Sequence, residues 1–132
     1  MDRSSLGPAG RVVWDFLTLF AQQRHAEANA YLAPDCRMLY PGGAVFTDCT
    51  QIPVAAAASY RKVQKTFERF DEHEAQDGTV VYSFGTLLGE WPDGEPFEGV
   101  RYLDRFVIRD GKVQDKKVWN DMCLAAAARK RR

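Results

Sequence analysis

Four polar residues near the ends of apolar segments could carry acid–base chemistry. Asp104 lies two residues before Phe106, and burial among aromatic side chains would favour its neutral form, which suits an acid, a hydrogen-bond donor or a base. Tyr40 directly precedes a Pro-Gly-Gly turn, and its phenol could donate a hydrogen bond. Asn120 and Asp121 close the last alternating segment and could supply an amide donor and a second base.

Each of these residues also has a purely structural interpretation. Asp104 faces the helices only if the strand 97–109 turns its aromatic face inward, and otherwise it pairs with an arginine on the outer face. Tyr40 could be half-buried with its hydroxyl in water. Asn120 and Asp121 could cap the end of the sheet, and a one-residue change of parity decides which of the two points inward.

The elements that would position these residues form one α+β domain with helices packed on one face of a bent sheet. Three Asp-Gly pairs, at 77–78, 93–94 and 110–111, predict the tight turns of a four-strand antiparallel meander. The predicted helices are about 11–23, 26–32 and 53–70, the last being the longest, and the predicted strands are about 36–40, 72–76, 79–91, 97–109 and 112–122. Long strands with interior glycines indicate a sheet that curls around something.

Composition excludes several classes of protein. The 132 residues are 45% hydrophobic, which is enough for one domain with a real core. Eighteen basic residues balance eighteen acidic ones, but the last four residues are all basic, so the rest is mildly acidic and unsuited to nucleic acid. We therefore expect a loose N-terminal arm at 1–9, one domain at 10–124 and a basic tail at 125–132.

Motif searches lead us to expect no metal and no cofactor. The chain has no phosphate-binding loop, dinucleotide-binding turn or serine-hydrolase elbow. Its three cysteines have neither zinc-site nor disulfide spacing, which fits a reducing compartment. No apolar stretch is long enough for a signal peptide or a membrane span, so we expect a cytoplasmic protein that does not bind a membrane.

Aromatic and apolar side chains would form the walls of a small-molecule pocket around the polar residues, although such residues are often plain core. The predicted wall residues are Trp14, Phe16, Tyr60, Val63, Phe67, Tyr82, Phe84, Tyr102, Phe106 and Trp119.

Four short motifs between residues 31 and 121 carry a resemblance to a known family, which covers the chain from about residue 10 to residue 122. They are Tyr31-Leu32-Ala33-Pro34-Asp35-Cys36, Tyr40-Pro41-Gly42-Gly43, Arg109-Asp110-Gly111-Lys112-Val113 and Val118-Trp119-Asn120-Asp121. The chain thereby resembles the SnoaL-like branch of the nuclear-transport-factor-two superfamily. The resemblance implies a curled antiparallel sheet that forms a cone packed against three N-terminal helices, a cystatin-like α+β barrel around an apolar pocket.

Members of this superfamily include ketosteroid isomerases, limonene-type epoxide hydrolases, scytalone-type dehydratases and polyketide cyclases. The isomerases use a tyrosine on the first helix, an aspartate base before a proline and an aspartate two residues before an aromatic. In this chain those positions fall on Phe16, Tyr40 and Asp104, so two of the three differ. Ketosteroid isomerisation itself is therefore not expected. The epoxide-hydrolase pattern is also incomplete, because parity places Arg101 opposite Asp104.

These observations predict a cofactor-independent acid–base enzyme of the isomerase, dehydratase or cyclase type acting on an apolar small molecule. Asp104 would be the main acid or base and Tyr40 the orienting donor. A non-catalytic module that binds a hydrophobic ligand is one alternative. A dimerisation module with a filled interior is another, and Leu103 and Val107 on the outer sheet face would support a homodimer.

Overall fold

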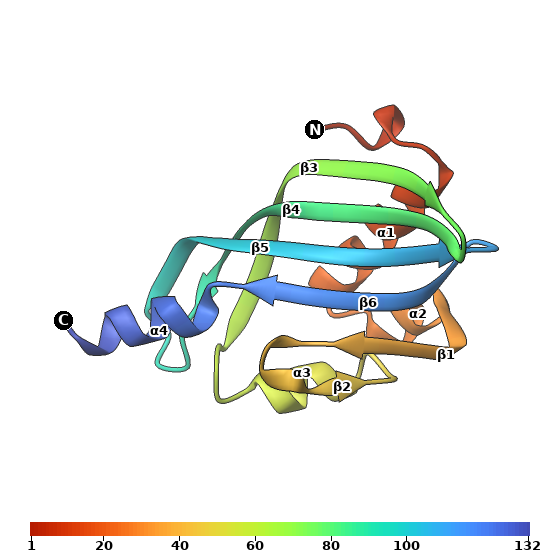
Figure 1. The fold of residues 1–132 in the computed structure, drawn as a ribbon. Coiled ribbons are helices and arrows are strands. Elements are labelled where there is room, and N and C mark those ends of the chain that lie inside the picture. The colour runs from red at the N-terminus through yellow and green to blue at the C-terminus, as the bar shows by residue number, and fades with distance from the viewer.

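The computed structural model describes all residues from 1 to 132 as a six-strand sheet with helices packed against one face (Figure 1). The elements in chain order are α1 (Pro8–Ala21), α2 (His25–Asn29), β1 (Leu32–Leu39), β2 (Val45–Phe46), α3 (Gln51–Ala56), β3 (Lys62–Ala75), β4 (Gly78–Glu90), β5 (Pro96–Arg109), β6 (Lys112–Asn120) and α4 (Met122–Lys130). Short 3₁₀ turns at Arg3–Ser5 and Pro41–Gly43 complete the chain. In Figure 1, α1 and α2 lie behind the sheet and α4 extends beyond its left end.

The sheet order is β2-β1-β6-β5-β4-β3, and the four strands from β3 to β6 form the predicted antiparallel meander. The three Asp-Gly pairs all fall in its connections, as predicted, and Asp110 and Gly111 both have the positive φ that such a tight turn requires. The α+β class and the packing against helices are confirmed. The sheet is mixed rather than wholly antiparallel, because β1 pairs with β6 in parallel, and it does not close into a barrel.

The predicted long helix at 53–70 is wrong. Helix α3 ends at Ala56, and β3 begins six residues later at Lys62. The error arose because Val63 and Phe67 are four residues apart, a spacing that fits one face of a helix and one face of a strand equally well. The alternating burial from residue 62 to residue 67 is that of a strand, and pairing with β4 along its whole length stabilises it in that form.

The sheet bends where an extra residue interrupts the ladder between β3 and β4. Phe67 pairs with Gly85 and Arg69 with Phe84, so Glu68 forms a bulge. A Cβ atom at Gly85 would lie 2.1 Å from the carbonyl oxygen of Thr66, so the strands approach more closely than any side chain allows. The bend visible in β3 (Figure 1) turns the first half of that strand across the inner face.

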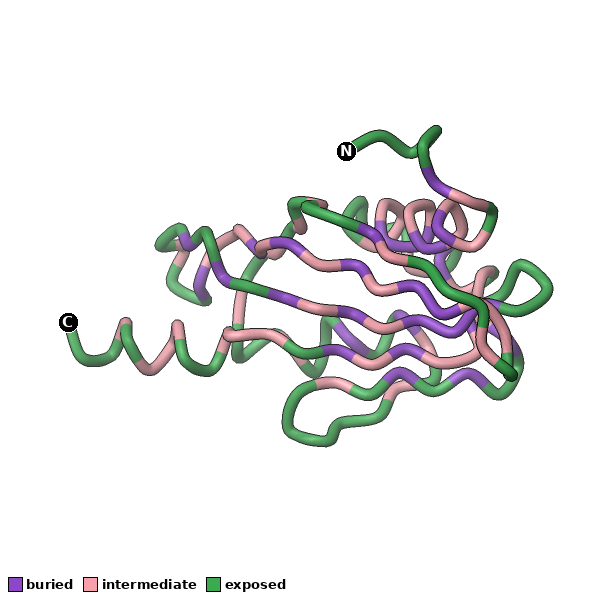
Figure 2. Tube along the Cα trace, turned by 45° about the horizontal axis from the view of Figure 1, so that its top comes forward, coloured by how far each residue is buried: buried purple, intermediate pink, exposed green.

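The main core lies between α1 and the inner face of the sheet. Val13 and Phe16 of α1 are fully buried, and the ring of Phe16 meets that of Phe106 edge to face at 6.0 Å. Burial alternates along the central strands, as Figure 2 shows. Phe106 and Asp104 are both fully buried on the inner side, so the strand parity predicted for the inner face is confirmed.

A second buried cluster at the far end of the sheet holds the C-terminal residues in place. Residues 125–132, predicted as a basic tail, lie mostly in α4, which packs against this cluster. The Arg129 guanidinium lies 5.5 Å from the centroid of the Trp91 ring and pairs with Asp93 and Glu95. At the other terminus, Leu6 is buried in the main core, so the predicted N-terminal arm is also packed against the domain.

We expect Gly85→Ala to destabilise the protein by about 3 kcal/mol or more, because the added methyl group meets backbone that cannot move without shifting β3. Gly99→Ala is the matched control. Gly99 has φ of 72° and open space around it, so its substitution costs only backbone strain, about 1 kcal/mol. Urea unfolding of both variants measures the difference, and equal losses would show that the close approach at Gly85 is unimportant.

Candidate acid–base site in the interior cavity

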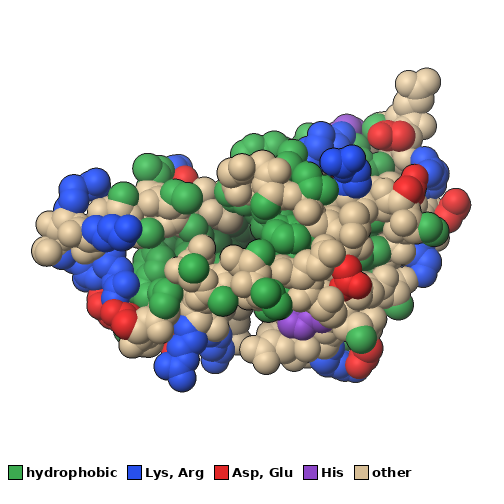
Figure 3. Space-filling model, turned by 90° about the horizontal axis from the view of Figure 1, so that it is seen from below, with side chains coloured by type: hydrophobic (Ala, Val, Ile, Leu, Met, Phe, Trp, Pro, Cys, Tyr) green, Lys and Arg blue, Asp and Glu red, His purple; other side chains and the backbone are tan.

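A cavity of about 500 Å³ lies between the inner face of the sheet and the helices. Its walls are mostly apolar and include Leu17, Phe20, Ile52, Val63 and Phe67. Viewed from below, hydrophobic side chains surround a hollow in the middle of the molecule (Figure 3). A cavity of this size and character accommodates a small organic molecule.

Asp104 and Lys65 form an ion pair on one wall of this cavity. The Asp104 side chain is completely buried, and its Oδ2 accepts a hydrogen bond from Lys65 Nζ. The bend of β3 carries Lys65 across the sheet, and its ammonium also lies 4.7 Å from the centroid of the Tyr102 ring. Asp104 Oδ1 is buried and accepts no hydrogen bond. One carboxylate oxygen is thus held by the lysine, and the other is buried without a hydrogen-bond partner.

Tyr40 and Lys116 form a second polar pair, which also lines the cavity. Lys116 Nζ donates a hydrogen bond to Tyr40 Oη at 2.8 Å. Lys116 is 1% exposed, and the rings of Phe16, Phe20 and Phe106 lie within 5.4–5.7 Å of its nitrogen. Burial lowers the pKa of Lys116, whereas the nearby Asp104 carboxylate acts in the opposite direction. Burial likewise raises the pKa of Tyr40, so its phenol stays protonated at neutral pH.

Five segments of the chain contribute to the surroundings of these four polar side chains. Tyr40 follows β1, Lys65 lies on β3, Asp104 on β5 and Lys116 on β6. The helix α1 supplies the aromatic rings that separate Lys116 from water. Asp104 and Tyr40 were predicted from the sequence to share a pocket, and both residues line this cavity.

The sequence analysis missed both lysines. Lys65 was missed because the segment was wrongly predicted as a helix, and a helix does not place Lys65 on the same face as Val63 and Phe67. Lys116 has the same parity as Val118 and Asn120 on β6, so alternation along this strand was a signal for an inward-pointing lysine. A lysine buried to this extent is rare in proteins without a functional or pairing role.

Asn120 and Asp121 have different surroundings. Asn120 lines the cavity, but its Oδ1 also accepts the backbone N–H of Met122 at 3.1 Å and so supports the start of α4. Asp121 does not line the cavity. Its Oδ2 accepts a hydrogen bond from Arg101 Nε at 2.7 Å in a groove on the outer face, and its backbone continues directly into α4.

Of the ten predicted wall residues, four line the cavity, namely Tyr60, Val63, Phe67 and Tyr102. Phe16 and Phe106 are fully buried in the core behind it, and Trp14 packs on Phe67 from α1 with ring centroids 4.8 Å apart. The other three are placed elsewhere because strand alternation turns them outward. Tyr82 stacks on His73, and Phe84 and Trp119 line the outer groove.

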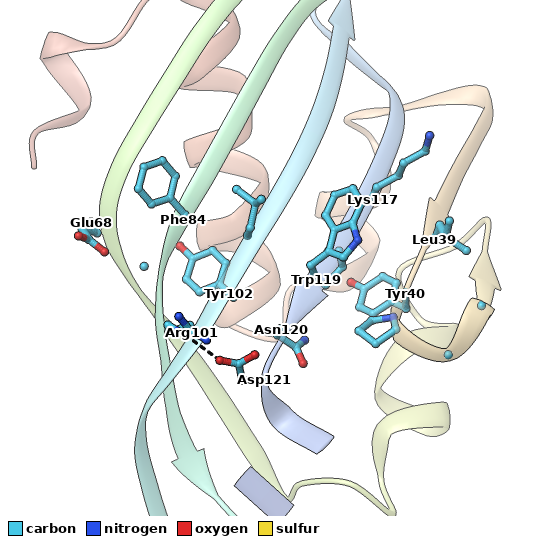
Figure 4. Close-up of a pocket in the computed structure, with 16 residues that line it drawn as sticks. Leu39, Tyr40, Glu68, Phe84, Arg101, Tyr102, Lys117, Trp119, Asn120 and Asp121 are labelled. Carbon is cyan, nitrogen blue, oxygen red and sulfur yellow. Dashed lines mark hydrogen bonds and ion pairs between the residues drawn. The ribbon is translucent and has the colours of Figure 1, made fainter. Parts of the chain in front are cut away.

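The outer groove is larger, at about 820 Å³, but it is open along the face of the sheet that carries no helix. Figure 4 shows Trp119 and Lys117 on this face, with Arg101 and Asp121 joined to each other. Its charged groups are therefore paired or solvated, in contrast to the free Asp104 oxygen of the cavity. Trp119 is 50% exposed, whereas Val107, which we expected to be exposed here, is buried.

Neither metal ligands nor membrane-spanning helices are found. No group of three or more histidine, cysteine, aspartate or glutamate side chains is arranged to hold a metal ion. None of the helices combines the length and apolar character needed to cross a bilayer.

No protein-family model matches the sequence, and no curated protein matches it either. Solved structures do match. TerC co-crystallised with polyporic acid superposes with a TM-score of 0.75 and 16% identity over 92% of this chain and 97% of that one. An NTF2-like protein of unknown function from Burkholderia pseudomallei gives 0.74 and 13% over the same shares. A putative SnoaL-like polyketide cyclase from Jannaschia sp. CCS1 gives 0.67 and 16%, over 92% and 90%.

These matches establish the fold of the protein. The chain has the NTF2-like fold, and its structural neighbours include SnoaL-like and ketosteroid-isomerase-like proteins. The resemblance predicted from the sequence motifs is thereby confirmed at the level of the fold.

We expect Lys65→Met to destabilise the protein by about 3–5 kcal/mol, because it leaves the Asp104 carboxylate buried without a counter-charge. Adding Asp104→Asn to this variant should recover part of the loss, since the amide carries no charge. Chemical denaturation measures both. Lys117→Met, on the outer face of β6, is the control and should change stability by no more than about 0.5 kcal/mol. Additive losses in the double variant would contradict the coupling.

Stability should fall in alkali partly because of Tyr60. Burial raises the pKa of Tyr60 to about 12, above the unfolded value of about 10. The stabilisation from its neutral phenol is complete below about pH 10 and is lost as pH rises from about 10 to about 12. Urea unfolding at a series of pH values should show a shallower alkaline decline for Tyr60→Phe than for the wild type. Identical pH profiles would refute the assignment.

Proposed function

We propose that the protein is a cofactor-independent enzyme that moves protons on an apolar small molecule bearing a carbonyl or hydroxyl group. One observation carries the proposal: Asp104, which has a carboxylate oxygen without a hydrogen-bond partner, and Tyr40, which has a protonated phenol, both line the same mostly apolar cavity. Isomerisation, dehydration and cyclisation all require a base and an oxygen-directed donor in this arrangement. The fold supports it, since a solved neighbour is described as a putative SnoaL-like polyketide cyclase.

In this mechanism Asp104 is the base. Its Oδ1 accepts a proton from the carbon next to a substrate carbonyl, while Lys65 holds Oδ2 and fixes the orientation of the carboxylate. The proton then returns to another carbon, or to a leaving hydroxyl, which gives isomerisation or dehydration. The apolar walls exclude water, so the short-lived enolate is not quenched at the wrong position.

Tyr40 is the donor that stabilises the enolate oxygen. Because Tyr40 Oη accepts a hydrogen bond from Lys116, its own hydrogen is free to donate to the substrate. The phenol is held neutral by burial, so it acts as a donor rather than as a base. This arrangement differs from that of the ketosteroid isomerases, since Phe16 offers no phenol and Tyr40 takes the position of their base.

A binding module that holds a hydrophobic ligand without turnover is the second candidate, because the same cavity would serve it. The filled interior expected of a pure dimerisation module receives no support. A second copy of the chain against the outer face remains part of the proposal, with the half-exposed Trp119 as the apolar anchor. Three free cysteines, two of them buried, fit the reducing conditions of a cytoplasm.

The test is exchange of the α-hydrogens of 2-tetralone, an apolar bicyclic ketone, for deuterium in D₂O, followed by proton NMR. The wild type should accelerate the exchange. Asp104→Asn should lower the rate by about 100-fold or more, because the base is lost, and Tyr40→Phe should lower it by about 100-fold through loss of the oxyanion donor.

Asp115→Asn is the matched control, because Asp115 is a half-exposed carboxylate on β6 that faces Arg105 rather than the cavity. It should exchange at the wild-type rate. Binding of the ketone without enhanced exchange would favour the binding module, and an equal loss in Asp104→Asn and Asp115→Asn would exclude Asp104 as the base.

A further inference from the structure

Lys116 is a buried amine that forms no ion pair. Its only hydrogen-bond partner is Tyr40 Oη, and aromatic rings surround the rest of its head group. Lys65, the other lysine of the cavity, is instead bound directly to a carboxylate. The two amines therefore experience opposite environments although they line one cavity.

Burial favours the neutral form of Lys116, and no neighbouring side chain forms an ion pair with it. From β1 and the segment before α3 it faces the thiols of Cys36 and Cys49, whose own pKa values burial raises to about 12 and about 11, so both are uncharged. From β5 it faces the Asp104 carboxylate, whose charge the Lys65 ammonium already balances. From α1 it faces only aromatic rings. Desolvation is the largest influence on the pKa of Lys116 and lowers it.

We propose that Lys116 Nζ is a nucleophile that forms an imine with an apolar aldehyde or ketone bound in the cavity. A desolvated lysine without a carboxylate partner is the form of this side chain that attacks carbonyl carbons. The N–H donated to Tyr40 orients the amine, and its lone pair remains free for attack. The cavity brings the carbonyl to the amine and excludes the water that would hydrolyse the product.

The atoms balance without any further reagent. The neutral amine nitrogen bonds to the carbonyl carbon, and the carbonyl oxygen takes up one of the two amine protons to give a carbinolamine. The C–O bond then breaks, the nitrogen gives up its second proton to the departing hydroxyl so that water leaves, and the nitrogen forms a double bond to carbon. Tyr40, hydrogen-bonded to the same nitrogen, is placed to deliver the proton to the departing hydroxyl.

This chemistry goes beyond the proposed function, because it requires neither Asp104 nor an α-hydrogen on the ligand. It also restricts the expected ligand to apolar aldehydes and ketones. A protonated imine withdraws electrons from the neighbouring carbon more strongly than a ketone does. An aldehyde or ketone held by Lys116 as the protonated imine would therefore have an activated α-carbon, which the unpartnered Asp104 carboxylate oxygen could deprotonate.

The experiment uses 2-naphthaldehyde, which has no α-hydrogen and therefore cannot report on the proposed proton transfer. The folded protein is incubated with the aldehyde and sodium cyanoborohydride at pH 7, and the hydride converts any imine into a stable naphthylmethyl amine. Peptide mass spectrometry then gives the rate of labelling at each lysine. Lys116 should react at least about tenfold faster than Lys117, because the cavity holds the aldehyde beside the Lys116 amine, whereas Lys117 meets it only from bulk solution.

Lys117 is the matched control because it follows Lys116 on the same strand and lies on the outer face. Protein unfolded in urea should label both lysines equally. In Asp104→Asn, Lys116 should still be labelled at least as fast as in the wild type, because the carboxylate that favours its charged form is gone. In Lys116→Arg, labelling in the cavity should disappear.

The proposal is overturned if Lys116 in the folded wild type is labelled no faster than Lys117, or if cavity labelling transfers entirely to Lys65. This readout is taken on wild-type protein, so it does not depend on whether a variant folds. Because the aldehyde has no α-hydrogen, a failure of labelling leaves the deuterium-exchange result untouched, and the reverse also holds.

Discussion

The free-energy cost of burying charged groups beside an apolar cavity is the constraint on which this structure depends. Asp104 is completely buried, and an isolated carboxylate there would cost several kcal/mol. Lys65 supplies the counter-charge from the far edge of the sheet, two strands away from β5. The ion pair therefore exists only if β3 crosses the inner face, and the bulge at Glu68 with the close approach at Gly85 provides that crossing.

The same bend creates the cavity that the charged groups line. Val63, Lys65 and Phe67, on the first half of β3, all line this cavity. Here α1 packs on one part of the sheet and α4 with its aromatic cluster closes the far end. The bent strands between them leave a space of about 500 Å³. The bend that pairs Asp104 with Lys65 thus also places both residues at the wall of a cavity large enough for a ligand.

The parts of the fold set by local signals could be predicted from the sequence. Asp-Gly pairs specify tight turns by their backbone preferences, so the meander was predicted within a few residues apart from its first strand. The secondary structure of the segment 62–70 could not be predicted, because the spacing of Val63 and Phe67 fits both a helix and a strand. Pairing with β4 decides in favour of the strand. That one ambiguity concealed Lys65. Parity along the strands led to Asp104 and Tyr40, but the sequence left open which face of the strand 97–109 turns inward. The packing of Phe106 against Phe16 of α1 decides it.

The environment of Lys116 could not be predicted from the sequence for a different reason. The same reason explains how this chain differs from its structural neighbours. Alternation along β6 indicates that Lys116 points inward, but its environment depends on rings from α1 and β5 that no local pattern brings together. At 13–19% identity, the solved neighbours share the path of the backbone but few of the side chains on it. The fold supplies a bent sheet and an apolar space, and the side chains that face this space determine the chemistry. In this chain those side chains include two amines, one bound to a carboxylate and one without a counter-ion. In the two functions proposed here, the paired amine of Lys65 orients the Asp104 base, and the unpaired amine of Lys116 bonds to a carbonyl group.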